Sequence, residues 1–334
     1  MMADNNAIRH NEKNEAIQAA LEKKAARKAL INSIVPYFGL IFIVGFFIIV
    51  TQGKFVSADN IGNLINQGFV LIMIAVGSSF VYAHGGMDFS IGAVSGVAQL
   101  VCGLLILAGV PLPICILACV AVCVIGASCT AAISLLLSVP VFIGSMTVRT
   151  SFTGILKTAT TNSDISILFS DYAFMNNTAI KAVILAVVIS LGIYLFNYTT
   201  IGKYNKALGG NMLTAQQAGV SKNRVIFMAY LLMGTCVGIA SVFAFFRAGT
   251  VSAYSGNGYE FNIMMAIVLG GFPMTGGEKS RILSAIIGAL TVTCLSNGLQ
   301  LWGLDALLVS GVKGILFVII VALSYDRSAG KLVS

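Results

Sequence analysis

The sequence predicts an all-α polytopic membrane protein, on the basis of its composition and the length of its apolar blocks. Of the 334 residues, 57% are hydrophobic and only 10% are charged. A soluble domain carries about 25% charged residues, so this chain has too few charges to cover a surface that faces water. The apolar residues form blocks of roughly twenty, the length that an α-helix needs to cross about 30 Å of hydrocarbon. Together these observations exclude a soluble protein.

About ten membrane segments are expected, at 34–50, 64–83, 89–109, 112–137, 140–157, 179–198, 223–247, 259–272, 281–301 and 303–324. An even number of crossings places both termini on the same side of the membrane. The N-terminal tail and the loop at 199–222 are rich in Lys and Arg, whereas the loop at 158–178 has neither and contains two acids. Because Lys and Arg accumulate in cytoplasmic loops, we expect the tails at 1–33 and 327–334 and the 199–222 loop in the cytoplasm. The transmembrane domain then covers 34–326, in the inner or plasma membrane.

The sequence also argues against several partners and cofactors. Glu12, Glu15 and Glu22 interleave with the basic residues of the N-terminal tail, which argues against a nucleic-acid partner. The seven cysteines lie in apolar stretches without polar ligands, so we expect them to pack between helices and to bind no metal. The two histidines, His10 and His84, stand far apart without a cluster of cysteines or carboxylates, so the chain is not expected to be an enzyme. It contains no Gly-x-x-x-x-Gly-Lys-Ser/Thr motif, so it is expected to bind no ATP and no other cofactor itself. If ATP powers this protein, ATP and magnesium must bind to a separate subunit.

Two of the segments are expected to be too short to cross alone. The continuous apolar part of the second is 68–83, roughly 24 Å as a helix, and that of the eighth is 261–272, roughly 18 Å. Each ends in a related turn of the pattern Gly-Gly-x-x-x-(Ser/Thr)-x-Gly, at 85–92 and 270–277. Short segments interrupted by glycine mark broken helices near a translocation path, although two ordinary tight turns at the membrane surface would give the same pattern. The candidate pathway residues are Gly85, Gly86, Asp88, Ser90, Gly92, Tyr259, Glu260, Gly270, Gly271, Thr275, Gly276 and Gly277.

Four charged residues fall within or beside these apolar segments. Asp88 and Glu260 each stand at the start of a predicted helix, where a carboxylate caps free N–H groups and meets the positive helix end. Solute binding or proton coupling is the other interpretation, because a carboxylate in a bilayer costs about 2.5–3.5 kcal/mol and needs a reason to be there. For Arg149 and Lys313, the expectation is that their side chains extend toward the membrane interface.

The 199–222 loop contains a short predicted helix. Asn211 is placed to cap it and Gly219 to end it. Gly92 and Gly96, and likewise Gly234 and Gly238, have the four-residue spacing that lets helix backbones approach closely in lipid. The helices are therefore expected to pack as a bundle, with a short helix outside the membrane on which a partner could push.

Several of these motifs together resemble the permease family of bacterial ABC importers for ribose, galactose, xylose and related solutes. The resemblance rests on 85–92, on 209–220, and on Gly258-Tyr259-Glu260-Phe261 through Thr275-Gly276-Gly277, and their order and spacing hold from about 60 to 325. The sequence departs from the family at Asn262, where Asp is usual, and at Thr153, where Arg often precedes the glycine.

The resemblance implies a ten-helix permease fold of the vitamin-B12-importer kind, also called the type II ABC importer fold, with broken helices. It implies a second permease copy, either identical or paralogous, a cytoplasmic ABC ATPase, and an extracellular or periplasmic solute-binding protein. It further implies that a coupling helix in the 199–222 loop docks into the ATPase. The residues implied there are Gly210, Asn211, Thr214, Ala215, Gln216, Gln217, Ala218 and Gly219.

The predicted function is therefore the permease subunit of an ATP-driven importer for a monosaccharide or similar polar solute. One alternative is a stand-alone ion-coupled carrier that uses Asp88 and Glu260, and another is a permease of the same family for nucleosides. The sequence does not identify the solute.

Overall fold

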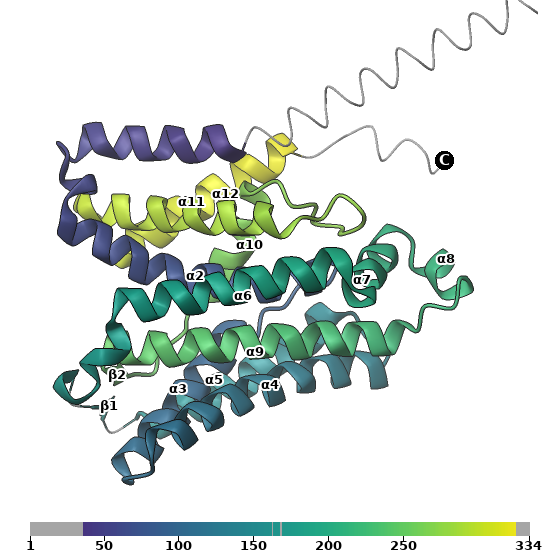
Figure 1. The fold of residues 1–334 in the computed structure, drawn as a ribbon, viewed down its shortest axis with the longest axis horizontal. Helices are drawn as coiled ribbons and strands as arrows, with labels where there is room; N and C mark the ends of the chain where they lie inside the picture. The colour runs from purple at the N-terminus through teal and green to yellow at the C-terminus, as the bar shows by residue number, and fades with distance from the viewer. Residues whose placement is uncertain (1–35, 162, 168, 325–334) are drawn as a thin grey trace, which may run out of the picture.

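A computed structural model describes residues 36–161, 163–167 and 169–324, which form a helical bundle (Figure 1). The tails predicted at 1–33 and 327–334 lie outside the described residues. The first described helix is Pro36–Val50. The elements that follow are η1 Lys54–Val56, α2 Ala58–Ala83, α3 Ile91–Leu107, α4 Leu112–Leu136, α5 Val141–Ala159, β1 Ile165–Ser166, η2 Phe169–Asn176, α6 Thr178–Tyr198, α7 Thr200–Gly210, α8 Met212–Gln217, α9 Lys222–Ala248, β2 Thr250–Val251, α10 Tyr259–Leu269, α11 Ile282–Leu301 and α12 Ala306–Ser324.

The membrane-protein prediction is confirmed by the length and polarity of these helices. Within the described ranges, five helices (α2, α4, α6, α9 and α11) are long and apolar enough to cross a membrane. Pro36–Val50, α3, α10 and α12 are shorter apolar helices, and α5 is 19 residues long but more polar. Each predicted segment corresponds to one of these ten helices, whereas the number that cross stays a prediction.

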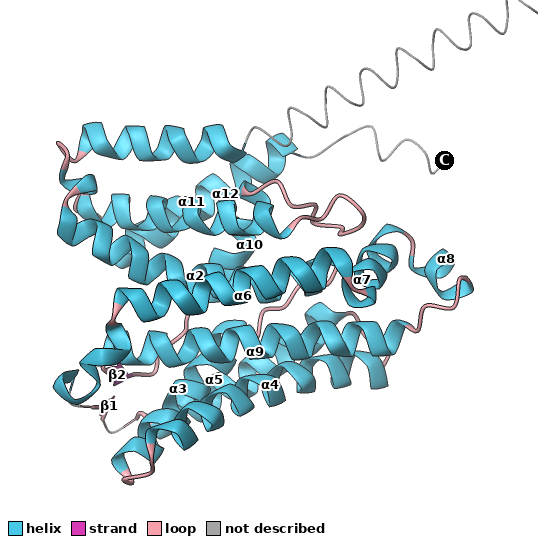
Figure 2. Ribbon diagram, in the orientation of Figure 1, coloured by secondary structure: helices cyan, strands magenta, loops and turns pink. Residues whose placement is uncertain are grey.

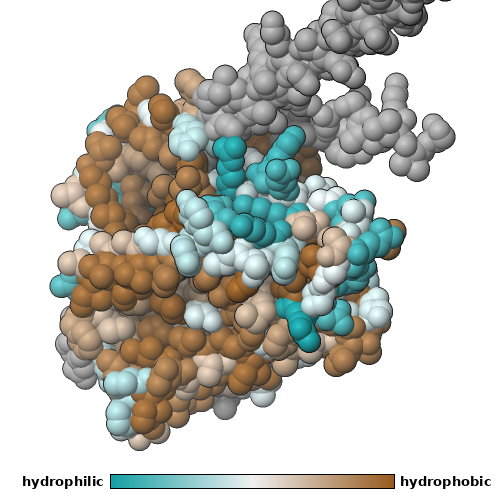
Figure 3. Space-filling model, turned by 45° about the vertical axis from the view of Figure 1, so that its right-hand side comes forward, coloured by the Kyte–Doolittle hydropathy of each residue, from teal (hydrophilic) through white to brown (hydrophobic). Residues whose placement is uncertain are grey.

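The long helices run side by side between two ends of the bundle (Figure 1). One end, here called the strand end, carries the antiparallel pair β1–β2, in which Ile165 lies opposite Val251 (Figure 2). The other end, the α8 end, carries α7 and α8. Hydrophobic residues cover the flanks of the bundle, while hydrophilic residues gather at the α8 end (Figure 3). An apolar belt with a polar end is the surface that a membrane-embedded bundle requires.

Helix α9 lies at the centre of the bundle, packed between α2 and α4. The glycine spacing explains how closely α9 and α4 approach: a Cβ added at Gly234 would lie 2.8 Å from Val124 Cα, and one at Gly238 would lie 2.7 Å from Val120 Cα. On α4, Cys119 and Cys123 are fully buried, and Cys123 contacts Ser241 of α9 at 3.7 Å. These cysteines therefore pack between helices, and the described residues contain no cluster of metal-binding side chains.

The expectation that the second segment is too short to cross alone is wrong. Helix α2 has 26 residues, which is about 39 Å of helix. The apolar stretch underestimates the length of α2 because the helix begins with polar residues, whose side-chain amides form hydrogen bonds with other helices. Asn60 and Asn297 of α11 exchange two hydrogen bonds of 2.9 Å, and Asn66 accepts from Lys181 of α6 at 2.5 Å. Polar groups satisfied in this way do not need to leave the membrane.

Candidate functional site

Helices α3 and α10 are too short to cross about 30 Å of hydrocarbon, since their 17 and 11 residues give only about 25 and 16 Å. Helix α3 begins inside the bundle, where Ser90 and Ile91 lie beside Cys123 and Gly234. Cys123 and Gly234 fall near the middle of α4 and α9. The segment 84–90, which is not helical, leads there from the end of α2. The broken helix in the first half of the chain is therefore α3 and not α2.

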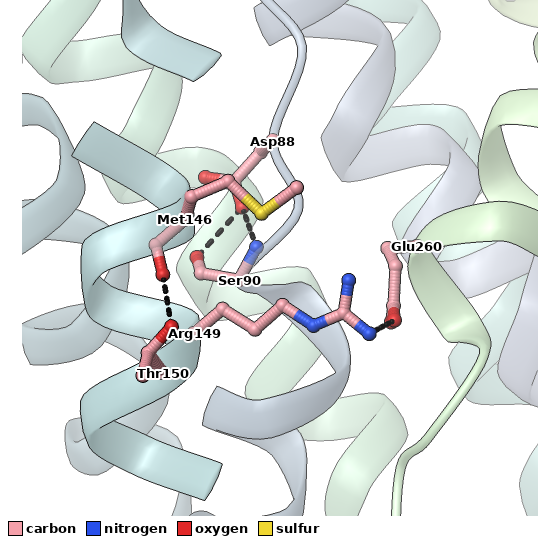
Figure 4. A network of polar contacts seen from close by, with 6 residues as sticks. All are labelled: Asp88, Ser90, Met146, Arg149, Thr150 and Glu260. Atoms are coloured by element: carbon pink, nitrogen blue, oxygen red, sulfur yellow. Dashed lines mark hydrogen bonds and ion pairs between the residues drawn. The ribbon is translucent and has the colours of Figure 1, made fainter. Parts of the chain in front are cut away.

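Asp88 lies just before the start of α3, and its carboxylate holds Ser90, the residue that precedes the helix. Its Oδ1 accepts from the Ser90 backbone N–H and from the Ser90 hydroxyl, both at 2.6 Å (Figure 4). The Asp88 side chain is only 2% exposed, so it does not open onto a surface in this conformation. Its second oxygen, Oδ2, is buried without a partner among the described residues.

The N-termini of α3 and α10 meet inside the bundle. A Cβ added at Gly92 of α3 would overlap the Gly256 carbonyl oxygen and the Glu260 carboxylate, and one at Gly96 would lie 2.5 Å from the Ser255 carbonyl oxygen. Only glycine allows the backbones to come this close. Because a helix N-terminus carries a partial positive charge, two such ends lie close together here, with Tyr259 and Glu260 in the first turn of α10.

Arg149 of α5 pairs with Glu260 across this junction. Arg149 Nη2 lies 2.9 Å from Glu260 Oε1, and the two side chains are 28% and 2% exposed (Figure 4). Similarly, Lys313 of α12 donates to Asn262 of α10 at 2.8 Å. The expectation that Arg149 and Lys313 extend toward the membrane interface is therefore wrong. The start of α10 offers both cations an acceptor within the bundle, which avoids leaving a charge unpaired in hydrocarbon.

Arg149 also lines a shallow, open groove along the outer face of α5, and all of the residues that line it belong to this one helix. The lining residues recur every three or four positions and so lie on one face of the helix. They are Met146, Arg149, Thr150, Thr153, Gly154 and Lys157. The groove is thus a polar stripe with two basic residues on a helix whose exposed neighbours include Phe142, Ile143 and Ile155.

The two predicted glycine turns touch each other at the α8 end. The Gly277 amide donates to the Ala83 carbonyl at 2.9 Å, and a Cβ added at Gly85 would lie 3.0 Å from the Thr275 carbonyl oxygen. Gly85, Gly276 and Gly277 have φ angles of 82°, 73° and 96°, in the left-handed region that favours glycine. These parts of the two motifs therefore form tight turns at one end of the bundle, and in the first motif the chain continues through 88–92 to a helix that begins inside the bundle.

Helix α7 packs onto these turns and connects them to α8. A Cβ added at Gly209 would overlap the Ala83 carbonyl oxygen and lie 2.5 Å from the Gly277 amide nitrogen. His84, which follows α2, makes a 2.9 Å hydrogen bond from its Nδ1 to Asn205 Oδ1 of α7. Since this oxygen is an acceptor, Nδ1 carries the proton. We call Ala83, His84, Asn205, Gly209 and Gly277 the α7 junction.

The short helix predicted in the 199–222 loop is present as α8. The Asn211 side chain accepts from the Thr214 N–H at 3.0 Å, and Gly219 has a φ of 88° beyond the end of the helix. Ala215 is buried against Leu208, Val220 and Val225. The other predicted coupling residues are exposed: Gly210, Asn211, Thr214, Gln216, Gln217, Ala218 and Gly219. Helix α8 therefore rests on one side chain and presents the rest of its surface outward.

The remaining candidates support packing. A Cβ added at Gly86 would lie 2.8 Å from His84 Nε2, one at Gly270 would overlap the Ser284 carbonyl oxygen of α11, and Gly271 has a φ of 71°. Sequence reasoning missed the ion pair of Arg149, the groove on α5 and the role of Asn205. The groove had a signal, since polar residues recur at helical spacing from Arg149 through Thr153 to Lys157.

Comparison with known proteins identifies the type of bundle. Residues 60–321 match the family model described as "Branched-chain amino acid transport system / permease component". The chain belongs to this permease family. Its short half-helices and its helix outside the apolar belt are thus features of a transport subunit, and the permease is not itself an enzyme.

The permease is similar to sugar permeases over most of its length. It is 29% identical to a ribose import permease protein of Bacillus subtilis (strain 168), over 95% of this chain and 100% of that protein. It is 29% identical to a D-allose transport system permease protein of Escherichia coli (strain K12), over 93% and 97%. A galactofuranose transporter permease protein of the same strain is 24% identical over 79% of each chain. No solved structure matches the permease.

Proposed function

We propose that this permease is the membrane subunit of an ATP-driven importer for a monosaccharide, and that it works with a second permease copy, an ABC ATPase and an external solute-binding protein. The relatives named as ribose, allose and galactofuranose permeases support the class of solute. ATP and magnesium belong to the ATPase in this proposal. The fold proposed is that of the vitamin-B12-importer kind.

The observation that carries ATP coupling is α8, a capped helix that stands out from the end of the bundle. Exposed Leu213 offers an apolar contact, and helix-in-groove recognition uses such anchors. Through the α7 junction, movement of α8 would be transmitted both to the C-terminal end of α2 and to Gly277 in the 270–281 loop. Alternating access would follow as two permease copies rock about a shared path.

We assign the α8 end to the cytoplasm, and both tails with it. The charged residues exposed at this end are mostly basic: Lys203, Arg224, Glu278, Lys279 and Arg281. An excess of Lys and Arg marks cytoplasmic loops. The strand end would then receive the loaded solute-binding protein.

The polar stripe on α5 supports a second copy and an aqueous path. Arg149, Thr150 and Lys157 would be costly in contact with lipid tails, so they need water or protein opposite them. The stripe is therefore suited to line a water-filled path between two copies.

The test is uptake by proteoliposomes that contain the permease and the ATPase that copurifies with it. Uptake of radiolabelled monosaccharides should require ATP and the loaded solute-binding protein. Leu213→Asp should remove ATPase binding without changing the unfolding temperature, because the Leu213 side chain is 67% exposed. Accumulation by the permease alone under a proton or sodium gradient would refute the proposal and favour an ion-coupled carrier.

A further inference from the structure

The groove on α5 has more hydrogen-bond donors and acceptors than it would need only to line a path filled with water. Arg149 uses Nη2 for its ion pair with Glu260, while 28% of its side chain stays exposed, and a guanidinium has five N–H donors in all. Thr150 donates its hydroxyl proton to the Met146 carbonyl at 2.9 Å, which leaves its oxygen as an acceptor. Thr153 adds a second hydroxyl to the groove. Charged donors and neutral acceptors thus lie side by side.

This set of groups matches the chemistry of a polyhydroxylated solute. Each sugar hydroxyl both donates and accepts, so neighbouring hydroxyls can accept from Arg149 and donate to Thr153. Arg149 and Thr153 stand four positions apart, which makes them neighbours on the helix surface.

The Arg149 side chain is held in place before any solute arrives. Glu260 is 3% exposed and belongs to the first turn of α10, so the ion pair ties α5 to the meeting point of the two half-helices. An arginine fixed in this way loses less conformational freedom on binding than one free in water. The groove is open on its outer side, however, and only a second permease copy would close it around a solute.

We propose that Arg149 and Thr153 contact the transported monosaccharide directly, so that the permease itself selects among the sugars that the solute-binding protein delivers. The contact site is formed by the α5 stripes of two copies and lies between the strand end and the middle of the bundle. This inference rests on the proposed function, since it requires the α5 stripe to line the path of a sugar.

The experiment compares D-ribose and D-allose uptake by proteoliposomes that contain the importer with its native ATPase. The solute-binding protein is supplied in excess and saturated with one sugar at a time, so its own affinity does not limit the rate. Thr153→Val removes the hydroxyl at nearly constant volume and should slow uptake about fivefold, with a changed ribose-to-allose ratio. Arg149→Lys keeps a cation opposite Glu260 but loses the fork of donors, and should slow uptake about tenfold.

Thr147→Val is the matched control. Thr147 lies on α5 but outside the groove, and its exposed hydroxyl donates to Ile143 of the same helix. This variant should keep both uptake rates and their ratio. Wild-type rates and ratios in all three variants would overturn the contact site while leaving the importer intact. Failure of the wild-type protein to take up any monosaccharide with ATP would overturn the proposed function, and this inference with it.

Discussion

Gly209 and Gly210 are adjacent on α7, yet the structure predicts opposite results when each is changed to alanine. A Cβ at Gly209 would overlap the Ala83 carbonyl oxygen and lie 2.5 Å from the Gly277 amide nitrogen, whereas one at Gly210 would meet no atom within 4 Å. The atoms in the way at Gly209 are backbone atoms, which cannot rotate aside as a side chain can. Gly209→Ala must therefore separate α7 from the two glycine turns.

The magnitude follows from three terms. Overpacking against backbone costs about 1–3 kcal/mol. Weakening the hydrogen bond from Gly277 to Ala83 costs about 0.5–1.5 kcal/mol more. Replacing glycine by alanine in a helix returns up to about 1 kcal/mol, a gain that both variants share. The unfolding free energies of the two variants should therefore differ by about 1.5–4.5 kcal/mol, with Gly209→Ala the less stable.

The assay is thermal and denaturant unfolding of the full chain in detergent, followed by ATP turnover in the reconstituted importer. We expect Gly210→Ala to be as stable as the wild-type protein or up to about 1 kcal/mol more stable, with ATP turnover unchanged. In Gly209→Ala, stimulation of ATP turnover by the loaded solute-binding protein should be lost, because movement of α8 is no longer transmitted through α7 to α2. Equal stability of the two variants would refute the close packing at the α7 junction. Equal stimulation despite a stability difference would refute its role in coupling.

Three further predictions concern single contacts. In a double-mutant cycle with alanine at Asn60 and Asn297, unfolding free energies should give a coupling of about 0.6–1.7 kcal/mol, and additive losses would contradict the reciprocal amide pair. Burial lowers the pKa of His84 to about 4, from an ordinary value of about 6.5. The folded protein therefore keeps its full stability above about pH 6.5, and this stability decreases as the pH falls toward 4. The loss should reach about 3 kcal/mol, and His84→Gln should abolish that part of the pH dependence in unfolding titrations. Asn211→Ala should remove the cap of α8 at a cost of about 1 kcal/mol, seen as faster amide exchange at Thr214 and unchanged global unfolding.

The elements of this bundle could be predicted because their causes are local. Apolar block length located each helix to within a few residues, apart from the start of α2, and the cap and stop residues of α8 were readable from Asn211 and Gly219. The start of α2 was misjudged because its polar amides pair with α11 and α6, which are more than a hundred residues away in the sequence. Similarly, Arg149 was expected to turn outward because Glu260, its partner, is equally distant along the chain.

The sequence by itself determined that this chain enters a membrane, where its helices lie and which carboxylates begin half-helices. Composition, span length and helix capping act over a few residues, so they can be read without knowledge of the fold. Only the tertiary structure decided which groups face one another: the N-termini of α3 and α10, Arg149 with Glu260, and Gly209 with Ala83. The physical reason is that the role of a glycine turn or a charged side chain depends on which backbone or opposite charge packing brings next to it. Without that packing, the same residues would be ordinary turns and solvated charges.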